Sequence, residues 1–166
     1  MPDNLNYQPL FSEILEKVAK LKTKKEKVAF LQRYNTDALR MVIKSSFDPK
    51  IEWDLPEGSV PFMPNEAPEG TEHTMLITEA RKLFHFIKGG NPKITRNKRE
   101  SMFVQMLEGL HESEANLLVA AKDKKLHQLY KGLSLNVVRE AFNWDDNFMV
   151  VEHEMYPQSA GSASGV

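Results

Sequence analysis

The residues best suited to chemistry lie where a short helical stretch begins, in LYKGLSLNVVREAF, residues 129–142. Lys131, Gly132 and Ser134 precede its apolar periodic part, and Arg139 lies inside it. A serine that caps a helix leaves other amides of the first turn free, and the helix dipole adds partial positive charge there. Such an N-terminus can bind a phosphate, although ordinary capping is the commoner role of a Gly-x-Ser pattern.

Two further helix N-termini combine a threonine cap with basic residues in the first turn. They consist of Thr23 with Lys24 and Lys25, and of Thr95 with Arg96, Lys98 and Arg99. A cation in the first turn opposes the helix dipole and costs about 0.3 kcal/mol or more. We therefore expect the three N-termini to converge on one surface that binds an anion such as a phosphate backbone. Solvated helix faces are the ordinary alternative.

Positive charge is concentrated in two regions, although the formal net charge of the chain is −1. Residues 1–50 hold ten Lys and Arg against six acids, and residues 81–142 hold twelve against six. Residues 51–80 and 143–166 hold neither Lys nor Arg. Local potential rather than net charge steers a charged partner, so this distribution is compatible with nucleic acid.

The sequence contains no recognisable catalytic or metal-binding constellation. It has no cysteine, which excludes disulfides and thiolate metal sites. Histidines and carboxylates cluster only at residues 111–114 and 152–154, without the i, i+4 histidine pair of a zinc protease. His85 lies among apolar residues, where packing is its expected role. We expect no enzymatic activity, no metal and no cofactor, and no apolar run is long enough to span a membrane.

The elements that must position these residues are helices, and the apolar spacing predicts an all-α fold with about seven of them. The expected helical stretches are 11–21, 23–35, 36–47, 76–87, 95–110, 111–123 and 129–142. Together they form one domain over residues 1–143, and an acidic-aromatic, Gly/Ser-rich tail follows over 144–166. Residues 48–73 contain five prolines and are expected to cross the helical body in an ordered, extended form.

The order of these helices resembles the N-terminal DNA-binding domain of ATP-dependent DNA ligases, in particular the T4-type phage ligases. The resemblance covers residues 10–143 and rests on FSEILEKVAKL, TKKEKVAFLQ and DALRMVIKSSF, with a Thr-Lys helix start and a final Gly-x-Ser start. It implies a domain that grips duplex DNA through the minor groove and the backbone phosphates, with amides of helix N-termini among the contacts. The residues expected to contact DNA are Thr23, Lys24, Lys25, Thr95, Arg96, Lys98, Arg99, Lys131, Gly132, Ser134 and Arg139.

A second resemblance, to short proteins of T4-like phages of marine cyanobacteria, rests on DPKIEWDLPEGSVPF and LLVAAKDKKL. Together the two resemblances imply a stand-alone phage protein in the cytoplasm of the infected bacterial host. It would assist DNA replication or repair without the adenylation and oligonucleotide-binding domains that seal a nick.

The sequence is also compatible with two other functions. NWDDNFMVVEHEM places Trp144, Phe148 and Met149 among acids. Such a tail could bind an apolar groove on a sliding clamp, a polymerase or a host factor, or it could fold back onto the helices. The fold could also serve in a virion component or in an inhibitor of a host factor.

Overall fold

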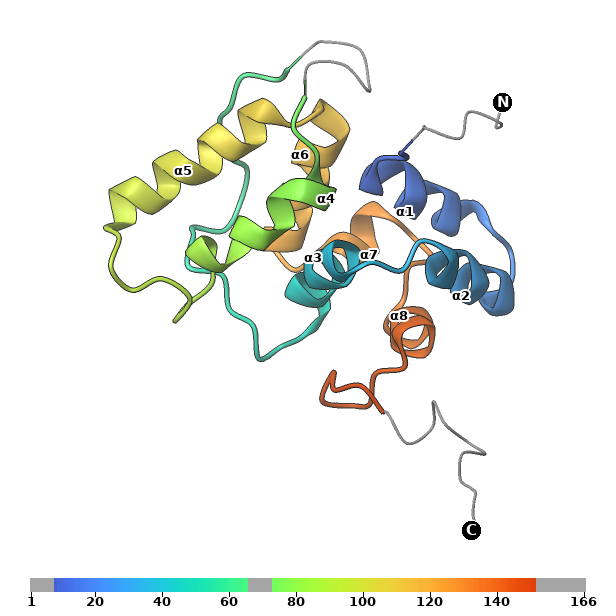
Figure 1. Ribbon diagram of the computed structural model, residues 1–166. Helices are drawn as coiled ribbons and strands as arrows, with labels where there is room; N and C mark the ends of the chain where they lie inside the picture. The colour runs from blue at the N-terminus through green and yellow to red at the C-terminus, as the bar shows by residue number, and fades with distance from the viewer. Residues whose placement is uncertain (1–7, 66–72, 152–166) are drawn as a thin grey trace.

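The computed structural model describes residues 8–65 and 73–151, and in this part of the chain the secondary structure is helical apart from isolated β-bridges (Figure 1). The prediction of a single all-α domain is confirmed. The helices are α1 Phe11–Lys20, α2 Lys24–Arg33, α3 Asp37–Phe47, α4 Leu76–Glu79, the 3-10 helix η1 Ala80–Phe86, α5 Arg96–Gly109, α6 Glu112–Lys122, α7 Leu126–Leu129 and α8 Leu135–Phe142.

The central helix of the domain is α3, which contacts α4, α6, α7, α8 and η1. Its apolar residues Leu39, Val42 and Ile43 are completely buried, as are Leu117 and Leu118 of α6. Burial of a leucine or isoleucine side chain contributes about 1.5–3 kcal/mol relative to exposure, so these two helices anchor the fold.

A buried carboxylate replaces the missing side-chain cap at two helix N-termini. Glu114 accepts hydrogen bonds from the amide of Phe11 at 2.7 Å, where α1 begins, and from the amide of Leu76 at 2.9 Å, where α4 begins. Such amides have no acceptor within their own helix. Burial raises the pKa of Glu114 even though both hydrogen bonds favour its ionised form.

The stretch expected as one helix over 76–87 is divided into α4 and the 3-10 helix η1. Its carboxyl end pairs with the chain after α3: the amide of Asp54 donates to Phe86 O at 2.7 Å, and the amide of Lys88 donates to Glu52 O at 2.8 Å. The chain also folds back so closely that a Cβ on Gly90 would lie 2.0 Å from Phe84 O. These contacts come from outside the helix, so its own periodicity does not predict them.

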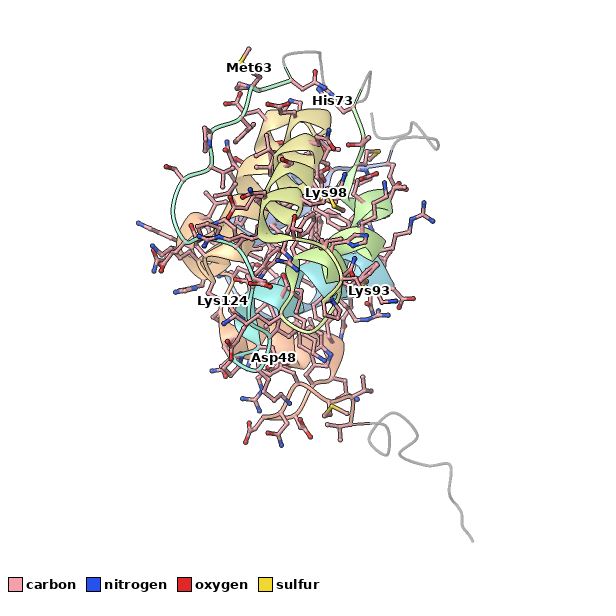
Figure 2. The ribbon with its side chains drawn as sticks, turned by 90° about the vertical axis from the view of Figure 1, so that its left-hand side faces the viewer. Asp48, Met63, His73, Lys93, Lys98 and Lys124 are labelled. Carbon is pink, nitrogen blue, oxygen red and sulfur yellow. The ribbon has the colours of Figure 1, made fainter. Side chains whose placement is uncertain are left out.

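The proline-rich segment is ordered over its described residues, 48–65, and runs from Asp48 to Met63 along the side of α5 (Figure 2). Trp53 fixes its beginning, because the indole is buried and its Nε1 donates to Ser45 O at 3.0 Å. The prediction of an extended crossing is confirmed for these residues, and residues 66–72 lie outside the described part.

Residues 144–151 fold back onto the helices, which is one of the two outcomes left open by the sequence. Trp144 and Phe148 are buried, and the amine of Lys44 in α3 donates to Phe148 O at 3.1 Å. Both aromatic side chains are therefore unavailable as anchors for a partner. Met149 is 58% exposed and stays accessible. The acidic residues 152–154 lie outside the described residues.

Candidate nucleic-acid interface

The N-terminus of α8 has the local structure that the sequence predicts. Ser134 caps the helix by accepting a hydrogen bond from the amide of Val137 at 3.3 Å. Leu133 before the cap and Val138 after it are completely buried, as expected for a hydrophobic staple. Gly132 has a φ of 98°, a left-handed conformation that favours glycine. The glycine is explained by this turn, so close approach of a ligand is not needed to account for it.

The N-termini of α2 and α8 lie close together. α2 packs against α8, and two lysines of α2 link the elements. The amine of Lys27 donates to Gly132 O at 3.2 Å, and the amine of Lys24 forms an ion pair with Glu140 at 2.9 Å. Thr23 and Glu26 form the predicted capping box at the beginning of α2, with hydrogen bonds of 3.1 and 3.3 Å.

The N-terminus of α5 lies on the opposite side of the molecule from that of α2 (Figure 1). The expected convergence of three N-termini is therefore wrong: two are adjacent and the third is separate. Thr95 caps α5 as predicted, with a 3.1 Å hydrogen bond from the amide of Lys98. Lys98 is exposed on the face that Figure 2 presents, and Arg96 forms an ion pair with Glu100 at 3.1 Å.

Arg99, expected from the sequence to contact DNA, has a structural position instead. Its side chain is 9% exposed. The guanidinium donates to the carbonyls of His85 at 3.0 Å and Asn91 at 3.1 Å, and it pairs with Asp54 at 3.3 Å. It thereby ties the loop before α5 to the proline-rich segment, which explains a cation in the first turn of the helix without invoking a ligand.

Arg139 is also held by the protein. It forms an ion pair with Asp146, a residue of the folded-back chain end, and its Nε is buried without a hydrogen-bond partner. Its charge is thus largely neutralised at the place where a phosphate contact was expected. Of the predicted basic residues near α8, Lys25 and Lys131 remain exposed without an ion pair in the described part of the chain.

Three lysines that were not expected from the sequence to contact DNA, Lys20, Lys22 and Lys27, join Lys25 and Lys131 in this part of the molecule. The carbonyl of Ala19 lies 3.4 Å from the position of a Cβ on Gly132, so the end of α1 adjoins the loop before α8. We define the lysine surface as Lys20, Lys22, Lys25, Lys27 and Lys131. The sequence does contain a sign of this surface, because residues 17–27 hold six lysines and only one glutamate.

Within the described residues, no group of three histidine or acidic side chains is arranged to hold a metal ion. No helix of that part is both long and apolar enough to cross a bilayer.

Comparison with known proteins identifies a family. Neither a curated protein nor a solved structure matches the chain. A family described as a family of unknown function, DUF6433, matches residues 14–128, from α1 through α7. That range includes every lysine of the lysine surface except Lys131, and it covers well over half of the sequence. The chain belongs to the DUF6433 family.

Proposed function

We propose that this protein binds the phosphate backbone of duplex DNA through the lysine surface, weakly and without sequence preference. The observation that carries the proposal is that the end of α1 and Lys27 of α2 meet the loop before α8, in stretches of the chain that are rich in lysine. None of the five takes part in an ion pair within the described residues; the amine of Lys27 donates to Gly132 O, and the other four are exposed. Contacts between lysines and phosphates supply the affinity for DNA and make it depend on salt.

Two helix N-termini add to the positive potential of this surface. The caps of α2 and α8 each satisfy one amide, and the remaining first-turn amides have no acceptor within their helix. The dipoles of both helices favour an anion there. Lys25 in the first turn of α2 is thus placed where a bound phosphate offsets an otherwise unfavourable charge.

A duplex is favoured over a single strand as the ligand. Proteins that bind single strands stack bases on exposed aromatic rings. Tyr130, next to Lys131, is buried, and burial and the nearby carboxylates of Glu16 and Glu114 raise its pKa. It offers no ring for stacking.

The resemblance to the ligase DNA-binding domain supports the same ligand and suggests the context. We place the protein, on that resemblance, among the accessory proteins of phage DNA replication or repair. The helix order and the paired Thr-Lys and Gly-x-Ser N-termini carry the likeness, whereas the α5 N-terminus does not join them (Figure 1).

Fluorescence anisotropy with a labelled duplex tests the proposal. Binding should be measurable at about 50 mM salt and should weaken steeply towards about 200 mM. Lys131→Gln should reduce the slope of log K against log salt by about 0.9, the value for one phosphate contact. Absence of binding at the lower salt concentration contradicts the proposal.

A protein-binding role is the second candidate, and a specific apolar surface favours it. Met41, Phe84, Met149 and Val150 are exposed by 43, 48, 58 and 48%. They line two neighbouring grooves that share Met41 and Lys44. A sliding clamp or a polymerase is the partner class expected from the sequence. Titration with a purified phage clamp tests it: Met41→Ser combined with Met149→Ser should abolish binding, while Leu129→Ser, an exposed control elsewhere, should not.

A further inference from the structure

A cavity lies between the proline-rich segment and α5, outside the lysine surface. Its volume is about 190 Å³. Carbon atoms form most of its wall, from Leu55, Pro56, Val60, Pro61, Phe103 and Val104. Figure 2 shows how the segment from Asp48 to Met63 passes along α5 and forms this side of the molecule.

The wall of the cavity is fixed by a buried lysine. The side chain of Lys122 is 1% exposed, and its amine donates to Pro56 O at 2.7 Å, Gly58 O at 3.1 Å and Asp123 Oδ1 at 2.5 Å. The same Asp123 carboxylate accepts from the amide of Gly58 at 3.1 Å. Gly58 has a φ of 104°, and the ring of Pro56 restricts its own φ. Because these contacts already hold the wall of the cavity in place, ligand binding costs little conformational entropy.

The polar groups of the cavity select against an anionic ligand. An ammonium group has three donors, and all three of Lys122 are used by the protein. No donor of this amine is left for a ligand carboxylate. Glu100 also lines the cavity, and its carboxylate is already paired with Arg96 at 3.1 Å. Neither of these two charged groups offers an anion a free partner, and a neutral ligand needs none.

The size and the lining of the cavity define the class of ligand. An engineered apolar cavity of about 150 Å³ binds benzene. The present cavity is slightly larger, and its proline, valine and phenylalanine side chains present flat and branched apolar surfaces. We infer that it is a binding site for a small neutral aromatic molecule of one or two rings. This inference does not depend on DNA binding.

Titration of the isotope-labelled full chain with indole, followed by amide NMR, tests the inference. Saturable shifts are expected for the amides of residues 55, 57–60 and 100–104 at indole concentrations up to about 10 mM. Benzoate, a single-ring anion, should bind at least about tenfold more weakly. Overturning results are an absence of saturation, shifts confined to the groove around Met41, or benzoate binding as tight as that of indole.

A cavity-filling variant provides the second arm of the test. Val104→Phe should reduce indole affinity at least about tenfold, and Val150→Phe, on the exposed apolar surface, should leave it unchanged. A folded Val104→Phe protein that binds indole normally contradicts the site. If this variant does not fold, the indole-induced amide chemical-shift changes of the unmodified protein decide whether indole binds in the cavity.

Discussion

At the scale of single residues, the proposed interface depends on side chains that play two kinds of role. Ser134 and Thr23 cap helices, whereas Lys25 and Lys131 are exposed and pair with none of the acids in residues 8–65 and 73–151. Arg99 and Arg139 have the right charge in the sequence but are committed to carbonyls or to Asp146. Charge type alone therefore does not identify a phosphate contact, because the partner of each cation is set by the fold.

Ser134→Ala should affect stability rather than DNA binding. The substitution removes the cap of α8 and should lower the free energy of unfolding by about 1 kcal/mol, measured by urea denaturation. The salt slope for duplex binding should stay within error. Thr95→Ala is the matched control, because it removes the same kind of cap from the distant α5. A large loss of DNA affinity specific to Ser134→Ala would show that its hydroxyl contacts DNA.

Glu114 should make the stability of the protein depend on pH. Burial raises its folded pKa above the reference value of 4.5, so ionisation disfavours the folded state. The favourable contribution of the protonated carboxyl is complete below pH 4.5 and is lost as pH rises through the raised folded pKa. Glu114→Gln cannot titrate, so the wild-type protein should lose stability relative to this variant between acidic and neutral pH. Urea denaturation at several pH values measures the difference; an opposite trend contradicts the assignment.

At the scale of elements, the N-termini of α5 and α2 look alike in sequence but differ in what they contact. Both begin with a threonine cap and basic residues. In α5 the buried Arg99 joins the preceding loop to the proline-rich segment, whereas the first turn of α2 adjoins α8. The two N-termini lie apart, so under the proposed function the DNA contact belongs to α2, while the first turn of α5 holds the proline-rich segment.

Arg99→Gln should destabilise the fold by about 2 kcal/mol or more, because charge-assisted hydrogen bonds from a buried guanidinium to two backbone carbonyls are lost. Its DNA affinity should match that of the wild type when both are measured well below the melting temperature. Arg96→Gln is the paired control: it removes an exposed ion pair in the same turn and should change stability by less than about 0.5 kcal/mol. Equal effects of the two variants would contradict the structural role.

The elements themselves were largely predictable, because caps and apolar periodicity are local. Thr23 with Glu26 and Ser134 with Leu133 and Val138 behave as their spacing predicts. The 3-10 form of η1 was not predictable, since it accompanies pairing with residues 52–54 that are distant in sequence. The relative position of helix N-termini is likewise a tertiary property, which is why α5 was wrongly grouped with α2 and α8.

At the scale of the whole molecule, the end of the described chain is part of the body rather than a separate tail. Phe148 is 4% exposed, and the amine of Lys50 donates to Asn147 O at 2.7 Å. The acidic-aromatic composition of this stretch suggests either docking or packing, and only the fold distinguishes them. Within the described part of this stretch, Asp146 forms an ion pair with Arg139 of α8.

Phe148→Ala should lower the free energy of unfolding by about 3 kcal/mol, because a buried aromatic ring is removed from the core. Met149→Ala, at the neighbouring exposed position, should change it by less than about 0.5 kcal/mol. Thermal and urea denaturation of the two variants measure the contrast. Similar small effects of both substitutions would mean that the chain end does not pack in solution.

The most direct test of the account compares two charge reversals by anisotropy across a salt series. Lys25→Glu combined with Lys131→Glu changes the lysine surface, and Lys93→Glu combined with Lys98→Glu changes the α5 side to the same extent (Figure 2). The first pair should abolish duplex binding at about 50 mM salt, and the second should retain most of it. Loss of binding only in the second pair, or equal loss in both, would contradict the assignment of DNA binding to the lysine surface.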